Sequence, residues 1–326
     1  MAADLYDAYP VARETLDQAD AELGFALTPL MFNGPLASLT LTAHAQPAIL
    51  AHSVALLRVL QHTFGLQTRR FGYALGHSLG EYAALVATGA LDYADALRLV
   101  RARGVAMQEA TGIARAQSPG GETAMRAFVV PRSPPGQTEA RITAITAEVA
   151  RVQAALPRGD IVEVANVNSG TQIVLAGTLD GVLAAGSALQ TRGFAGRCVA
   201  LPVSSPFHCT LMQPAAEAMR GHLRHVRLRE PATDVLSNMT GMPYRSVDDI
   251  RDGLAAQVTG TVQWYRSMLY ARDDRVHEWA VIGPSRVLFN LLRKEFPEDK
   301  VWPIATAADL LRHGEALARS SEALAL

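Results

Sequence analysis

The pentapeptide Gly76-His77-Ser78-Leu79-Gly80 lies between two segments of opposite character. Residues 71–75 are mostly apolar and typical of a short buried strand, whereas residues 81–87 are rich in helix formers. A serine on a sharp strand-to-helix turn is exposed at the edge of a sheet, and its flanking glycines let the backbone bend tightly. The following helix directs free N–H groups and its positive dipole toward any oxyanion that forms there. The pattern therefore predicts a nucleophilic Ser78 in an α/β fold.

Strand-like and helix-like segments alternate on both sides of this turn. Before it, a helical pattern of apolar residues opens at Pro47. After it, residues 93–110 are expected to form a helix and residues 111–121 a loop that ends in a Pro-Gly-Gly breaker. Later helices are expected at residues 211–223 and 286–294, and strands at residues 234–238, 276–282 and 301–305. Such alternation predicts a mostly parallel sheet covered by helices.

A compact unit interrupts this alternation. Strands are expected at residues 124–130, 161–167, 171–176 and 197–201, with helices at residues 137–155 and 179–191. The resulting β-α-β-β-α-β order is typical of a ferredoxin-like subdomain. We therefore expect an insert at residues 123–199 within a catalytic α/β domain made of residues 1–122 and 200–326.

Composition excludes several classes of function. The formal net charge is −1 and aromatic residues make up 6%, so neither a basic field nor a stacking surface favours nucleic acid. No apolar run is long enough for a membrane span, and the N-terminal residues do not resemble a signal peptide. The two cysteines, Cys198 and Cys209, lack the spacing of metal ligands and are too few for a disulfide framework. We expect no metal, no nucleic acid, no membrane contact and a reducing compartment.

A serine hydroxyl needs a base to take its proton, and histidine is the usual base near neutral pH. Of the nine histidines, His208 has the most suitable position, because it lies just after the last strand of the predicted insert. Loops at strand ends are where α/β proteins collect catalytic groups. A structural role for His208 remains the alternative at this point.

Six segments of the chain together resemble malonyl-CoA:acyl carrier protein transacylases. These segments are Gly76–Tyr82, Arg101–Gly104 with Met107–Ala110, Asn166–Ser169, Pro206–His208, Val262–Trp264 and Ile282–Pro284. They span nearly the whole chain in the order expected for that family. The resemblance implies an α/β-hydrolase-like domain with a mostly parallel sheet and a ferredoxin-like insert. It also implies transfer of a malonyl group from malonyl-CoA to the phosphopantetheine thiol of acyl carrier protein through a malonyl-serine intermediate. This transfer would supply fatty-acid synthesis.

The resemblance assigns a role to each residue of the expected catalytic group. Ser78 is the nucleophile and His208 its base, and the main-chain carbonyl of Gln263 is expected to orient the histidine. The N–H of Leu79 is expected to donate to the oxyanion. Arg103 is expected to bind the free carboxylate of malonyl through two parallel hydrogen bonds.

Further residues are expected to line the substrate cleft. By resemblance, Phe207 narrows the pocket in favour of malonyl over branched substrates, and Asn166 and Asn168 lie in the same cleft. A turn role is the alternative for both asparagines. His77 is also expected at the substrate, although neighbouring side chains on such a turn point apart. No metal or redox cofactor is required, and the protein is expected to be a monomer.

The N-terminus departs from the family pattern. Family members begin with a short strand and a Gly-Gln-Gly-Ser-Gln-like loop whose glutamine supplies a second oxyanion donor, and this chain has neither. We expect an N-terminally truncated sequence, unpaired strand edges where the strand is missing, and one missing oxyanion donor. Residues 39–50 resemble fungal mitochondrial members, which predicts the mitochondrial matrix, with the cytoplasm as the alternative.

Two rival functions stay open from sequence. A serine esterase or thioesterase on the same scaffold would pair Asp160 or Asp180 with His277. The other rival is a truncated, inactive homologue that only binds a carrier protein. Arg103 argues against the esterase, because an enzyme that transfers to water has no need of a carboxylate clamp. The joint presence of Ser78, His208 and Arg103 argues against the inactive homologue.

Overall fold

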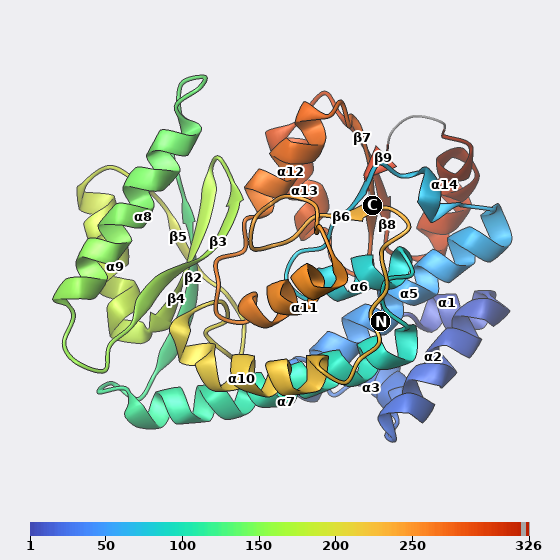
Figure 1. The fold of residues 1–326 in the computed structure, drawn as a ribbon, viewed down its shortest axis with the longest axis horizontal. Helices are drawn as coiled ribbons and strands as arrows, with labels where there is room; N and C mark the ends of the chain where they lie inside the picture. The colour runs from blue at the N-terminus through green and yellow to red at the C-terminus, as the bar shows by residue number, and fades with distance from the viewer. Residues whose placement is uncertain (321–323, 326) are drawn as a thin grey trace.

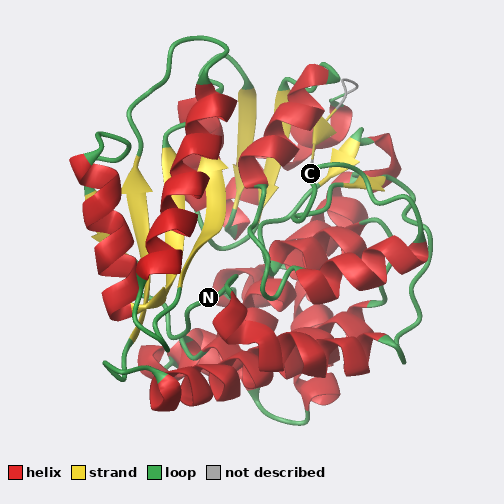
Figure 2. Cartoon of the chain, turned by 60° about the vertical axis from the view of Figure 1, so that its left-hand side comes forward, coloured by secondary structure: helices red, strands yellow, loops and turns green. Residues whose placement is uncertain are grey.

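The computed structural model describes residues 1–320, 324 and 325, which form two sheets with helices packed around them (Figure 1). A five-stranded sheet has the order β6-β1-β9-β7-β8, and a separate four-stranded sheet has the order β3-β4-β2-β5. Figure 2 shows the strands as these two separate groups. The predicted combination of an α/β part and a smaller inserted unit is thus observed.

The larger part is built from both ends of the chain. Its strands are β1 (Tyr73–Ala74), β6 (Asp234–Val235), β7 (Glu278–Ile282), β8 (Lys300–Ile304) and β9 (Leu324–Ala325). Its helices before the inserted unit are α1 (Ala3–Ala8), α2 (Pro10–Leu23), α3 (Leu27–Asn33), α4 (Leu36–Leu39), α5 (Thr42–Phe64), α6 (Gly80–Ala87) and α7 (Tyr93–Gln117), with a 3-10 turn at Thr68–Arg70. Those after it are α10 (Gln213–Leu223), α11 (Val247–Ala256), α12 (Trp264–Asp273), α13 (Val287–Glu295) and α14 (Ala307–Arg319), with a 3-10 turn at Thr210–Met212.

All pairings in the five-stranded sheet are parallel, as the alternation of elements predicts. The strand β9 lies between β1 and β7, where it pairs with Tyr73 on one side and with Glu278 and Trp279 on the other. The expectation of unpaired edges is therefore wrong for these three residues, because a segment from the far end of the sequence lies between the two strands.

The smaller part follows the predicted β-α-β-β-α-β order closely. Its elements are β2 (Thr123–Val129), α8 (Thr138–Ala155), β3 (Val162–Ser169), β4 (Gln172–Thr178), α9 (Leu179–Thr191) and β5 (Cys198–Ala200). All three strand pairings are antiparallel. The main chain of β3 is tied to the larger part by hydrogen bonds from Val167 N to Val262 O and from Val262 N to Ala165 O, both 2.9 Å long.

The helical layer corrects two expectations from sequence. Pro47 does not open its helix but lies five residues inside α5, which begins at Thr42. A proline leaves the carbonyl four residues earlier without its helical donor, and here Arg101 Nη1 donates to Ala43 O at 2.6 Å. A tertiary contact thus satisfies the carbonyl that the proline frees.

The second correction concerns α7, which continues to Gln117 instead of ending at Ala110. The expected loop therefore shrinks to residues 118–122. The added turns bury Thr111 and Ala114, so packing outweighs the weak helix preference of the Thr-Gly pair. In Figure 1, α7 runs along the lower edge of the molecule and reaches the smaller part.

The contact between α5 and α7 depends on a glycine. A Cβ added at Gly104 would lie 2.6 Å from Ala43 Cα and 2.6 Å from Thr42 O, so the two helices approach at backbone distance. Arg103 precedes this glycine on the same helix, so the close approach also determines how near Arg103 lies to α5.

We predict that Gly104→Ala lowers the free energy of unfolding by about 1–3 kcal/mol, because α7 must move away from α5. Gly112→Ala on the same helix is the matched control, since its Cβ would meet nothing within 4 Å. That control should be neutral or stabilising by about 0.5–1 kcal/mol, because alanine is the better helix former. Thermal and urea unfolding of both variants measure the effect, and equal stability of the two would contradict the prediction.

Candidate active site

The turn that carries Ser78 has the strained geometry expected of a nucleophile. Ser78 has a φ of +53°, a region that residues with a Cβ rarely occupy. A Cβ at Gly76 would lie 1.9 Å from the carbonyl carbon of Gly80, so only glycine fits there. Asn238 spans the turn, because its Oδ1 accepts from Ser78 N at 2.6 Å and its Nδ2 donates to Gly76 O at 2.7 Å. These bonds stabilise the strained conformation.

The structure brings the predicted nucleophile and base together. Ser78 Oγ lies 2.7 Å from His208 Nε2, and His208 Nδ1 lies 2.8 Å from the main-chain oxygen of Gln257. A carbonyl can only accept, so Nδ1 carries the proton and Nε2 is left free to accept the serine proton. Ser78, His208 and the Gln257 carbonyl are thus arranged like a catalytic triad, with a main-chain carbonyl in place of the usual carboxylate.

The assignment of the orienting carbonyl to Gln263 is wrong. Gln263 precedes α12, and its oxygen accepts from Ser267 N at 3.0 Å and Ser267 Oγ at 3.2 Å. Gln257 caps the C-terminal end of α11, where main-chain carbonyls lack partners within their own helix. The free carbonyl is therefore six residues earlier than expected. The negative end of the α11 dipole also favours the imidazolium that forms during catalysis.

The side chain of Arg103 is 2% exposed and contacts the nucleophile directly. Its Nη2 donates to Ser78 Oγ at 3.1 Å and to Gln257 Oε1 at 2.8 Å, and its Nη1 donates to Gln46 Oε1 at 2.8 Å. Its buried Nε has no partner. Within residues 1–320, 324 and 325, no carboxylate forms an ion pair with Arg103. A buried cation without an acid partner, beside a nucleophile, suits a substrate that carries its own carboxylate.

The expected oxyanion donor, the N–H of Leu79, lies at the N-terminus of α6. The N–H of Gly80 donates to His77 O at 2.9 Å and that of Glu81 to Ser78 O at 3.1 Å. The N–H of Leu79, which precedes both residues, donates to no acceptor in the part of the chain that the structure describes. It is free to stabilise negative charge next to Ser78, with the helix dipole in support.

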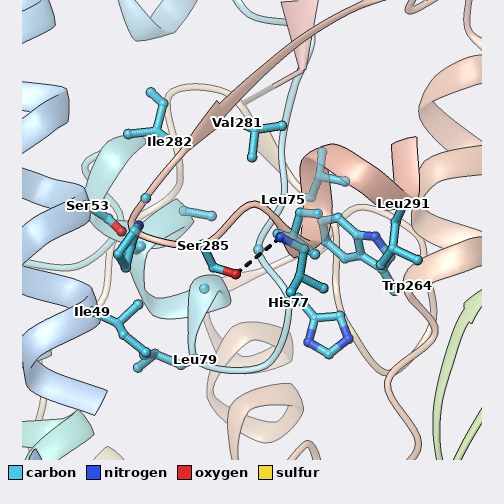
Figure 3. A pocket seen from close by; sticks show the side chains of 18 of the residues that line it. Ile49, Ser53, Leu75, His77, Leu79, Trp264, Val281, Ile282, Ser285 and Leu291 are labelled. Carbon is cyan, nitrogen blue, oxygen red and sulfur yellow. Dashed lines mark hydrogen bonds between the residues drawn. The ribbon is translucent and has the colours of Figure 1, made fainter. Parts of the chain in front are cut away.

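Three of the remaining four predicted residues line a cavity of about 600 Å³. His77, Asn166 and Asn168 line it, and His77 Nε2 lies 2.8 Å from Asn168 Oδ1. In Figure 3, His77 and Trp264 lie on one side of this cavity, and Ile49 and Leu79 on the other. Phe207 is outside this lining and packs edge-on against His208, with ring centroids 6.5 Å apart. The asparagines thus line this cavity, whose lining does not include Ser78, His208 or Arg103. Their place at the substrate, like the selectivity role of Phe207, stays a prediction.

Burial dominates the electrostatics of the site. It lowers the pKa of His208 to about 3, with the charge of Arg103 as the second cause. The histidine is therefore neutral, and ready to accept a proton, throughout the physiological range. Burial also raises the pKa of Glu81 to about 7, against the effect of three hydrogen-bond donors that favour its charged form.

The structure does not assemble the rival esterase triad. His277 directly precedes β7, and its Nδ1 is 3.3 Å from Asp299 Oδ1. Neither Asp160 nor Asp180 contacts it. Among the described residues, no group of His, Cys, Asp and Glu side chains has the geometry of a metal site, and no helix is both long and apolar enough to cross a membrane.

Sequence reasoning missed four buried polar residues of the site: Gln46, Glu81, Asn238 and Gln257. Asn238 ends a predicted strand of a parallel sheet, which is where such sheets collect functional groups, so its position was a usable signal. Gln46 and Gln257 lie in helical patterns that give no sign of burial. Only the tertiary arrangement, in which Gln46 on α5 and Gln257 at the end of α11 both accept from Arg103 on α7, brings them to the site.

We predict that Asn238→Leu lowers the free energy of unfolding by about 2–5 kcal/mol, because it leaves Ser78 N and Gly76 O buried without partners, at about 1–3 kcal/mol each. Asn290→Leu, at an exposed position on α13, is the matched control and should change stability by less than about 0.5 kcal/mol. Urea unfolding measures both variants. A loss at Asn238 no larger than that of the control would contradict the role of this side chain in bracing the turn.

We predict an acid destabilisation that depends on His208. Because its folded pKa is about 3 and the unfolded value is about 6.5, only the unfolded chain takes up this proton between these pH values. Stability is therefore complete above pH ~6.5 and falls below it. Between pH 6.5 and 5 the wild type should lose about 2 kcal/mol more than His208→Asn. Exposed His62→Asn is the control, and parallel pH curves for wild type and His208→Asn would refute the assignment.

Comparisons with known proteins agree with this geometry. A family model described as the acyl transferase domain matches residues 1–268. The malonyl CoA-acyl carrier protein transacylase of Escherichia coli strain K12 is 38% identical over 294 residues, covering 90% of this chain and 87% of that protein. The solved transacylase of the same name from Coxiella burnetii has a TM-score of 0.85 at 30% identity, covering 98% of this chain and 93% of that one. A type II polyketide malonyl-transacylase, solved in complex with its acyl carrier protein, has a TM-score of 0.84 at 34% identity, covering 97% of this chain and 94% of that one. The chain belongs to the acyl transferase family, among its malonyl-CoA–acyl carrier protein transacylases.

Proposed function

We propose that this chain transfers a malonyl group from malonyl-CoA to the phosphopantetheine thiol of acyl carrier protein through a malonyl ester on Ser78. The observation that carries this proposal is the position of Arg103. Its guanidinium is buried, lacks a carboxylate partner among the described residues, and lies 3.1 Å from Ser78 Oγ. A carboxylate on the acyl group would complete the hydrogen bonds of this cation.

In the first step, Ser78 Oγ attacks the thioester carbonyl carbon while His208 Nε2 takes the hydroxyl proton. The Gln257 carbonyl stabilises the resulting imidazolium through Nδ1–H, and the Leu79 N–H donates to the oxyanion. The carbon–sulfur bond then breaks. The CoA sulfur leaves with the proton from His208, and the malonyl group remains on Ser78.

In the second step, the thiol of the carrier arm enters the same cleft. His208 takes its proton, and the sulfur attacks the ester carbonyl carbon. The ester bond to Ser78 breaks and Ser78 Oγ regains the proton from His208, which restores the starting state. Both steps use the chain's own groups, so we propose that no metal or redox cofactor participates.

Selectivity for malonyl follows from the cost of leaving Arg103 without a carboxylate. Each charge-assisted hydrogen bond contributes about 1.5–3 kcal/mol. An acetyl group makes none, so a site built around this cation should disfavour acetyl-CoA strongly. We further propose that Phe207, beside His208, limits the width of the acyl site.

The carrier protein is proposed as the second substrate because a related transacylase has been solved with its carrier. Carrier proteins are acidic as a class, so a basic surface should receive this one. Arg192, an exposed arginine of the smaller part, is already paired with Glu148 at 2.6 Å. Exposed Arg197 and Arg224 are therefore the better candidates.

We also propose a fold class for each part of the chain. We propose that residues 123–199 be classed as a ferredoxin-like insert, since β3-β4-β2-β5 is the strand order of that class. Residues 1–122 and 200–326 are proposed as an α/β-hydrolase-like domain. The monomeric state and the mitochondrial location stay predictions, and the Escherichia coli relative gives no support to the latter.

Intact-mass spectrometry after brief incubation with malonyl-CoA tests the function. We predict a malonyl adduct on the wild type and none on Ser78→Ala, with transfer to acyl carrier protein once that is added. Arg103→Met should slow acylation by malonyl-CoA on the order of 10²-fold through loss of its charge-assisted bonds, with little change for acetyl-CoA.

Three results would count against this function. Equal labelling by acetyl-CoA would remove the role of Arg103. An adduct that is lost to water, and not to the carrier, would favour the esterase alternative. No adduct on folded wild type would favour the inactive carrier-binding alternative.

A further inference from the structure

A buried carboxylate that takes no part in the reaction lies directly behind the active site. Glu81 follows the serine turn, is fully buried, and accepts three hydrogen bonds. Its Oε1 accepts from Asn238 N and from Tyr244 Oη, both at 2.8 Å, and its Oε2 accepts from Gln257 Nε2 at 2.5 Å. Three donors converge on two oxygens, so the side chain serves as an acceptor only.

The third of these contacts determines which way the Gln257 amide faces. An amide has one end that donates and one that accepts. With Nε2 directed at Glu81, Oε1 is directed at Arg103 Nη2, 2.8 Å away. Nε2 also donates to Ser78 O at 2.9 Å. The acceptor on Glu81 and the donor on Arg103 therefore both favour the same orientation of the Gln257 amide.

Gln257 also contributes its main-chain carbonyl to His208. A single residue thus contacts the nucleophile's backbone, the base and the substrate-binding cation. Any rotation of its side chain would disturb the contacts with Ser78 O and Arg103, but it would leave the main-chain carbonyl in place beside His208.

We propose that Glu81 is a positioning residue for acyl-group selectivity, which fixes the orientation of the Gln257 amide so that its oxygen anchors Arg103 beside Ser78. The inference rests on the proposed function, in which Arg103 binds the malonyl carboxylate. It assigns the residue after the serine motif a part in choosing the substrate, although Glu81 contacts neither substrate nor reacting atoms.

The isosteric change Glu81→Gln separates this role from simple packing. Its oxygen can still accept from Asn238 N and Tyr244 Oη, but its new amide then faces Gln257 Nε2, donor against donor. The Gln257 amide must rotate to present its oxygen, which turns its own Nε2 toward Arg103 and removes the donor to Ser78 O. Arg103 loses an acceptor and moves from its position.

The test compares kcat/KM for malonyl-CoA and acetyl-CoA, with acyl carrier protein as acceptor. We expect Glu81→Gln to lower the malonyl-to-acetyl ratio about tenfold or more, since an acceptor of a charged donor is lost and acetyl does not use Arg103. Gln257→Met retains the main-chain carbonyl and should lower the ratio similarly. Both changes break the same chain of contacts, from Glu81 through the Gln257 amide to Arg103. The double variant should therefore lower the malonyl-to-acetyl ratio no further than either single variant.

Tyr244→Phe is the matched control. It removes one donor from the same Glu81 oxygen but leaves the amide orientation intact, so it should lower the melting temperature without changing the ratio. An unchanged ratio in Glu81→Gln, or additive losses in the double variant, would overturn the proposal. If Glu81→Gln does not fold, an unchanged ratio in Gln257→Met overturns it alone. A wild type with no preference for malonyl would instead overturn the proposed function.

Discussion

The guanidinium of Arg103, buried without a carboxylate partner among the described residues, is the charge around which the site is organised. Removing a cation from water is costly unless polar groups replace its hydration. Here two glutamine oxygens and a serine hydroxyl do so in part, and one buried nitrogen keeps no partner. The unmet part of this requirement is what a substrate carboxylate could supply. In the proposed function, the cost of burying Arg103 is therefore also the source of selectivity.

Two helix ends supply the remaining charge stabilisation. The free Leu79 N–H lies at the start of α6, where the proposed reaction forms its oxyanion, and the carbonyl of Gln257, the C-cap of α11, accepts from His208. These main-chain groups are fixed by their helices, so they need not reorganise as charge moves from serine to histidine. The strain at Ser78 is offset by the hydrogen bonds of Asn238, which follows strand β6.

Local features of the site could be predicted from the sequence, whereas the contacts that depend on helix ends could not. The motif at residues 76–80, the histidine after β5 and the order of the inserted unit carry local signals, and each was predictable. The orienting carbonyl was not, because any main-chain oxygen looks alike in sequence. Which one is free depends on where α11 ends and α12 begins. Pro47 shows the same limit, since an arginine on α7 satisfies the carbonyl that it exposes.

The sequence by itself determined the alternation of strands and helices and the serine turn, because periodicity and turn chemistry are local. Together with the family resemblance, it also singled out Ser78, His208 and Arg103, which meet in the structure. Only the tertiary structure decided which glutamines surround Arg103, which carbonyl orients His208, and that Glu81 lies behind both. These contacts join residues 57, 49 and 176 positions apart. Burial also decided the protonation states, since the same imidazole exposed on a surface would titrate near neutral pH.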